Sequence, residues 1–182
     1  MDTAEHLLIA LLAPGSVEAE VGRLQGRLFA AHGLVSAQAM PPLIPVSFVM
    51  AGEHTRGLLA ELDRSIPAPW RIRVTGTQWV EGSLYLGIDS AGAWAALRTR
   101  ARDLCGAEPP FLFPTAEGFF LGCGEAALEE RDRIRPAAPA ATFTSCNVAL
   151  VRIETAQTGE GWWREVYWEI AEQKPLRGRR ER

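Results

Sequence analysis

The order of strands and helices along the chain constrains its fold more than any other feature. Short apolar or alternating runs predict strands, and apolar residues at helical spacing after capping residues predict helices. The predicted strands cover residues 6–12, 46–50, 70–75, 83–88, 119–123, 143–155 and 162–170, and the predicted helices begin at Ser16, Thr55, Ser90 and about residue 125. The chain thus divides into two similar halves, each with strand–helix units and adjacent strands. This order indicates an α+β fold with antiparallel sheets rather than a doubly wound parallel sheet.

Length and charge restrict the domain number and the kind of partner. At 182 residues, 47% apolar, the chain fits one globular domain, which we expect over 1–174, followed by a basic, disordered tail over 175–182. The net charge of -3 argues against binding nucleic acid through bulk positive charge. A small site for a phosphate group or an RNA end is still compatible with this charge.

The cysteines and the N-terminal residues bear on cofactors and location. Three cysteines, Cys105, Cys123 and Cys146, are too scattered for a disulfide framework, and no Cys/His spacing suits zinc. We therefore predict no metal and no cofactor. The apolar run 7–13 is too short to cross a bilayer, and Asp2 and Glu5 before it are unlike a signal peptide. We expect a cytoplasmic protein that does not bind membranes.

Several segments together resemble a known superfamily. The run from His6 to Pro14, the segment Pro-Val-Ser-Phe-Val-Met-Ala-Gly-Glu at 45–53, Leu121-Gly122 and the strand ending at Glu154 follow one another in a typical order. This pattern, over about residues 5–170, resembles the 2H phosphoesterase superfamily, which includes bacterial RNA 2′,3′-cyclic phosphodiesterases, also called 2′-5′ RNA ligase-like proteins.

The resemblance implies a fold and a mechanism. The fold has two pseudo-symmetric lobes, whose antiparallel sheets face a central cleft with helices outside. Each lobe supplies one His-x-Thr/Ser motif. One imidazole acts as general base and the other as general acid, while the hydroxyls hold the phosphate. Residues two apart on a strand share a face, so both side chains of each motif would point into the cleft.

The chain departs from this pattern at both histidine positions. In the first motif Pro45 replaces histidine, while Ser47 keeps the hydroxyl. The second motif has two possible registers, and neither contains histidine: Thr115 with Glu117, or Gly118 with Phe120. Proline cannot transfer a proton, so the mechanism of the family does not carry over.

The remaining candidates define the predicted site. We predict that Ser47, Thr115, Glu117 and Tyr85 contact a ligand, with Tyr85 either stacking on a base or packing in the core. Of the three histidines, His6, His32 and His54, we expect ordinary structural roles, with His6 the best functional candidate because the first strand borders the cleft.

Three hypotheses about function remain open. The first is an inactive, diverged pseudoenzyme that binds a nucleotide, an RNA end or another phosphorylated ligand in its cleft. The second is a phosphodiesterase or other hydrolase that uses altered catalytic residues such as Glu117 or His6. The third is a protein-interaction module whose cleft is filled by its own side chains.

Overall fold

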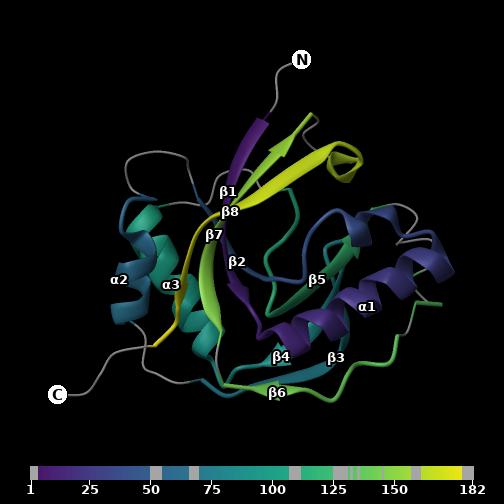
Figure 1. Cartoon of the computed structure of the whole chain (residues 1–182), viewed down its shortest axis with the longest axis horizontal. Helices are drawn as coiled ribbons and strands as arrows, with labels where there is room; N and C mark the ends of the chain where they lie inside the picture. The colour runs from purple at the N-terminus through teal and green to yellow at the C-terminus, as the bar shows by residue number, and fades with distance from the viewer. Residues whose placement is uncertain are drawn as a thin grey trace.

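The chain folds around two antiparallel four-stranded sheets (Figure 1). The computed structural model describes residues 4–49, 55–65, 70–106, 112–124, 131, 133–134, 136–144, 146–156 and 161–177. In chain order its elements are β1 (Ala4–Leu12), α1 (Gly15–His32), η1 (Val35–Gln38), β2 (Ile44–Val49), α2 (Leu58–Ser65), β3 (Ile72–Val80), β4 (Ser83–Asp89), α3 (Ala93–Cys105), β5 (Gly118–Cys123), β6 (Thr142–Phe143), β7 (Asn147–Thr155), η3 (Trp162–Arg164) and β8 (Val166–Pro175). The strand order is β2-β1-β7-β8 in the first sheet and β5-β4-β3-β6 in the second.

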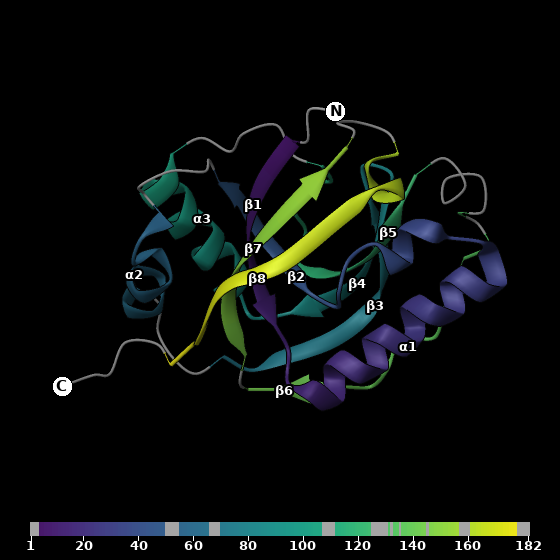
Figure 2. The same cartoon turned by 45° about the horizontal axis from the view of Figure 1, so that its top comes forward.

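The helices flank the sheets from opposite sides. Helix α1 contacts η1 and β5, whereas α3 contacts β2, and α2 contacts β7 and β8. Both views show α2 and α3 together on one side of the molecule and α1 on the other (Figures 1 and 2). The predicted α+β architecture with two lobes, antiparallel sheets and outer helices is confirmed.

The buried apolar residues form two clusters, because the central strand β1 is covered on both faces. The helix-side cluster contains Leu7, Ile9 and Leu11 of β1 and every buried apolar side chain of α1, α2 and α3. The inter-sheet cluster contains none from these helices and combines strand residues of both sheets. Its members are Leu8, Ala10, Ala39, Met40, Leu43, Phe48, Tyr85, Phe113, Ala116, Phe120, Cys123, Ala149, Val151, Ile153 and Trp162.

The start of α1 differs from its prediction. Ser16 is not the N-cap, because the helix begins at Gly15 after Pro14 and has no side-chain cap. The carbonyl of Pro14 accepts the first helical bonds, from the N–H groups of Val17 at 2.9 Å and Glu18 at 3.0 Å. Proline fixes φ near the value required at a helix start, so it takes the place we assigned to serine.

The predicted strand 143–155 is in fact two strands in different sheets. Phe143 pairs with Ile72 of β3 in the second sheet, while Asn147 pairs with Leu12 of β1 in the first. The chain therefore crosses between the sheets within this apolar run. Periodicity alone cannot reveal such a crossing, because both parts have extended, half-buried backbone.

The predicted strand 162–170 is also corrected. Trp162 to Arg164 form a 3₁₀ turn, which Gly161 precedes with a φ of 90°, and β8 begins only at Val166. This turn moves the Trp162 ring out of the strand and into the inter-sheet cluster, where it is 1% exposed.

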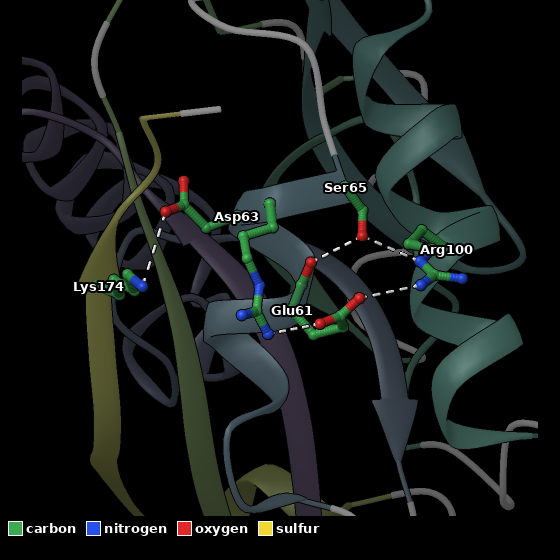
Figure 3. A network of polar contacts seen from close by, with 6 residues as sticks. Glu61, Asp63, Ser65, Arg100 and Lys174 are labelled. Atoms are coloured by element: carbon green, nitrogen blue, oxygen red, sulfur yellow. Dashed lines mark hydrogen bonds and ion pairs between the residues drawn. The ribbon is translucent and has the colours of Figure 1, made fainter. Parts of the chain in front are cut away.

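Polar contacts of α2 hold the end of β8 and helix α3 in place (Figure 3). Asp63 accepts a hydrogen bond from the Arg177 backbone N–H at 2.7 Å and lies 3.7 Å from Lys174 Nζ. On the other side of α2, the Arg100 guanidinium donates to Glu61 at 3.2 Å and to Ser65 at 3.1 Å. Residues 178–182 of the predicted tail, and most of the helix predicted near residue 125, lie outside the described residues.

Candidate functional site

Matching β-bulges relate the two halves of the molecule at the predicted catalytic positions. In the first sheet Pro45 pairs with Ala10 and Ser47 with Ile9, so the intervening Val46 is an extra residue. In the second sheet Phe120 pairs with Tyr85 and Gly122 with Leu84, which makes Leu121 the extra residue. Pro45 and Phe120 are therefore equivalent positions of the two sheets. Neither of our two registers for the second motif has Phe120 in the histidine position, because neither included a bulge.

The first bulge also separates the faces of Pro45 and Ser47. Residues paired across antiparallel strands lie on the same face of the sheet. Pro45 shares a face with Ala10 of the inter-sheet cluster, and Ser47 shares one with Ile9 of the helix-side cluster. Our expectation that these residues point into one cleft is therefore wrong, since an extra residue breaks the two-residue alternation. Ser47 is 1% exposed.

Aromatic rings fill the space between the two sheets. The Phe113 ring stacks on Phe120 with centroids 4.4 Å apart, and it lies 5.3 Å from Phe48 and 5.4 Å from Trp162. Tyr85 meets Phe120 edge-on at 5.8 Å. Each of these side chains is at most 2% exposed. The rings connect β2 of one sheet to β4 and β5 of the other, so this region is a packed core.

Tyr85 and Cys123 are the titratable groups of this core, and neither is reactive there. The Tyr85 hydroxyl donates a hydrogen bond to the Pro114 carbonyl. Burial raises the pKa of Tyr85 far above its ordinary value, so the phenol stays protonated. Burial likewise raises the pKa of the Cys123 thiol to about 12. A thiol with this pKa is a poor nucleophile at neutral pH.

Glu117 supports the start of α3. Its Oε1 accepts hydrogen bonds from the Ser90 hydroxyl and, at 3.2 Å, from the Ser90 N–H. Ser90 Oγ in turn accepts the Trp94 N–H of the first turn of α3 at 3.0 Å, although the N-cap of this helix is Gly92 rather than Ser90 as we predicted. The carboxylate of Glu117 is therefore engaged by Ser90 rather than free to act as a general base.

Thr115 and His6 have buried polar atoms without partners. Thr115 is 9% exposed, and its Oγ1 makes no hydrogen bond. His6 is half-buried, its ring lies edge-on to Phe48 at 6.4 Å, and its Nε2 has no partner. Burial lowers the pKa of His6 below its ordinary value, which favours the neutral imidazole. His32 ends α1, and His54 lies outside the described residues.

The structure does not bring the four predicted ligand contacts together around an open space. Ser47 lies on the helix side of its sheet, Tyr85 is fully buried, and Glu117 is bound to Ser90. Ligand binding by Ser47, Thr115, Glu117 and Tyr85 stays a prediction, and the burial of Ser47 and Tyr85 weighs against it. Sequence reasoning missed Phe113 and Trp162, for which the neighbouring Pro114 and Gly161 were the available signals of irregular backbone.

An open groove lies along β8. We call it the β8 groove; its volume is about 390 Å³. It is lined by Leu12, Ala13, Pro14, Gly15, Glu18, Pro41, Pro42, Cys146, Asn147, Trp168, Ile170 and Gln173. The rings of the inter-sheet cluster do not line it. Asn147 and Gln173 contact each other through their amides at 3.3 Å.

Within the described ranges, no group of three or more His, Cys, Asp or Glu side chains could hold a metal ion. Among the helices of the same residues, none combines the length and the apolar character that a membrane span requires.

Solved structures share this architecture. A phosphoesterase aligns with 96% of this chain and 99% of its own, with a TM-score of 0.58 and 14% identity. E. coli LigT complexed with 3′-AMP aligns with 94% of this chain and 98% of its own, at a TM-score of 0.55 and 14% identity. Apo LigT from E. coli covers 98% of this chain and 100% of its own, with a TM-score of 0.54 and 14% identity.

This chain has the 2H phosphoesterase fold. The likeness is one of structure, since the sequence matches no protein-family model and no curated protein. At the equivalent positions of the two β-bulges, however, this chain carries a proline and a phenylalanine.

Proposed function

We propose that this chain is a non-hydrolytic binding module built on the 2H phosphoesterase fold. The observation that carries the proposal is the packed aromatic core between the sheets, with Pro45 and Phe120 at equivalent positions. General acid–base catalysis needs groups that exchange protons near neutral pH, and neither residue has one. The engagement of Glu117 and the protonated state of Tyr85 support the same conclusion.

Hydrolysis of a 2′,3′-cyclic nucleotide tests this proposal. Purified chain incubated with 2′,3′-cyclic AMP should release product no faster than buffer alone, with an active phosphodiesterase as positive control. Turnover proportional to the amount of this chain would overturn the proposal, provided that it persists through repeated purification.

An altered hydrolase is the second candidate, and His6 is the observation that favours it. Its unpartnered Nε2 and lowered pKa suit a neutral imidazole that accepts a proton. If the chain hydrolyses the substrate, His6→Ala should abolish turnover, and His6→Gln should fail to restore it. Turnover unchanged in both variants would exclude His6 as the base.

The hypothesis of a binding module can be made more specific: the chain binds a nucleotide without hydrolysing it. The LigT complex with 3′-AMP shows that a protein of this fold holds a nucleotide. Here Thr115, with its unpartnered hydroxyl, is the predicted contact best placed to gain a hydrogen bond. Calorimetric titration with 3′-AMP should then show binding that Thr115→Val weakens. If titration to millimolar nucleotide releases no heat of binding, the packed core does not bind a nucleotide.

We retain a cytoplasmic location as part of the proposal. It is supported by the absence of disulfides among the described cysteines, Cys105, Cys123 and Cys146.

A further inference from the structure

We propose that the β8 groove and the free edge of β8 bind an extended, basic peptide segment of a partner protein, which joins the first sheet as an additional strand. The inference rests on the proposed binding function and gives it a site and a partner chemistry. Addition of a strand to a sheet edge is a general mode of peptide recognition, in which backbone hydrogen bonds supply affinity and side-chain pockets supply specificity.

The first observation is an unpaired strand edge. β8 ends the order β2-β1-β7-β8 and pairs only with β7 among the described strands; Figure 2 shows it as the outermost strand, crossing the front of the molecule. The Glu165 carbonyl accepts the Ala156 N–H at 3.3 Å, on the β7 side. Because backbone groups alternate in direction along a strand, those of Val166, Trp168 and Ile170 point to the free edge.

The second observation is that this edge adjoins the groove. The side chains of Trp168, Ile170 and Gln173 form its β8 wall, and Pro41 and Pro42 also line it. Ile170 is 40% exposed, which is high for a large apolar side chain. A strand paired with β8 would place alternate side chains on this same face, so its apolar residues would enter the groove.

The charges around the groove indicate that the partner segment is basic. Among the described residues that line the groove, Glu18 is the only charged one, and none of them is Lys, Arg or His. Glu18, Glu165 and Glu172 form no ion pair within the described part of the chain. Of the nearby cations, Lys174 and Arg152 are paired with Asp63 and Glu169, whereas the exposed Arg164 beside Glu165 has no ion pair among the described residues. Lysine or arginine side chains of an added strand would meet these three carboxylates, which outnumber Arg164 near this edge and therefore favour a basic segment over a phosphorylated ligand.

Calorimetry with synthetic peptides of alternating sequence tests the inference. The probe is acetyl-Lys-Val-Lys-Leu-Lys-Val-Lys-amide, compared with a peptide in which Glu replaces every Lys and with one in which Pro replaces Leu. The basic peptide should bind, and both comparison peptides should bind at least about tenfold more weakly, because the first repels the carboxylates and the second cannot complete the strand pairing.

Variants of the protein locate the site. Ile170→Lys should weaken binding of the basic peptide by about tenfold, since it removes an apolar contact and adds a like charge. Phe29→Ala on α1 is the matched control, because Phe29 is similarly exposed at 46% and does not line the groove. Circular dichroism establishes that both variants are folded.

Several results would overturn the inference. These are no binding at millimolar basic peptide, equal binding of the proline peptide, or equal loss in both variants. Dimerisation of the chain that Ile170→Lys abolishes would assign the edge to a second copy instead. If the basic peptide does not bind and the chain does not hydrolyse the cyclic nucleotide, only this binding site is rejected. If the chain hydrolyses the cyclic nucleotide, the proposed function is rejected.

Discussion

At the residue scale, Phe113 and Phe120 illustrate how the space between the sheets is closed. Their rings stack at 4.4 Å, and Phe113 also contacts Phe48 and Trp162. Phe113 comes from the segment before β5, so a single side chain joins a loop, both sheets and the η3 turn. Rings in such contact contribute both buried area and pairwise attraction.

Truncating Phe113 should therefore cost much of the folding free energy. We expect Phe113→Ala to lower the free energy of unfolding by about 3–5 kcal/mol, the usual range for a buried phenylalanine. Urea denaturation measures this loss, and Phe29→Ala, at a site 46% exposed, is the control. A loss below about 1 kcal/mol would mean that Phe113 is not packed between the sheets.

His6 should make stability depend on pH in the acid range. Burial lowers its pKa, so the unfolded chain binds the proton more tightly than the folded chain. The contribution of His6 to the free energy of unfolding is then fully present above its pKa in the unfolded chain, about 6.5. This contribution is lost as the pH falls through its lower pKa in the folded chain.

Denaturation at about pH 5 and about pH 8 measures this dependence. His6→Phe, which keeps a ring beside Phe48, should reduce the difference in unfolding free energy between the two pH values. An unchanged difference would show that His6 is equally solvated in both states.

At the element scale, η1 is fixed to β5 by one hydroxyl. Ser36 Oγ donates to the Cys123 carbonyl at 2.6 Å and accepts the Cys123 N–H at 2.8 Å. Gly122 lies directly beside this contact, where a Cβ would come within 2.8 Å of the Leu34 side chain.

Ser36→Ala should leave both backbone groups of Cys123 unsatisfied in a buried place. We expect a loss of about 1–3 kcal/mol in the free energy of unfolding. Ser16→Ala, in the exposed first turn of α1, should change it little. Equal losses of unfolding free energy in the two variants would show that the hydrogen bonds between Ser36 and Cys123 do not stabilise the fold.

Asp63 fixes the end of β8 to α2. Asp63→Ala removes the acceptor of the Arg177 N–H, so exchange of this amide with solvent should accelerate by about tenfold or more. Asp63→Asn retains a side-chain oxygen and should accelerate exchange less. Hydrogen exchange followed by NMR separates the two variants, and unchanged exchange in Asp63→Ala would show that another group holds Arg177.

Most elements could be predicted from periodicity and turn residues, but their irregularities could not. Glu81 and Gly82, both with positive φ, form the predicted turn between β3 and β4. The bulges at Val46 and Leu121 have ordinary apolar extra residues, so their only signals are the neighbouring Pro45 and Gly122, the latter with a φ of 146°, and our registers did not use them. The face of Ser47 and the position of Phe120 depend on these bulges, so the predicted site was less accurate than the fold.

At the scale of the whole molecule, this chain keeps the 2H architecture while filling its centre with aromatic side chains. Each of the two sheets has four strands and a bulge at the equivalent place, although the first sheet combines strands from both ends of the chain. The open groove instead lies along the outer strand of the first sheet. Leu12 and Trp168 line this groove and also pack against the inter-sheet cluster, so the surface that we propose binds a partner adjoins the filled space between the sheets.

Nuclear Overhauser effects between the aromatic rings test the central claim most directly. With labelled phenylalanine and tryptophan, we expect contacts of Phe113 with Phe48, Phe120 and Trp162 in the free chain. We also expect that these signals do not move when millimolar 2′,3′-cyclic AMP is added. Absence of the contacts, or shifts of these rings on addition of the nucleotide, would show that the space between the sheets is open and contradict the account.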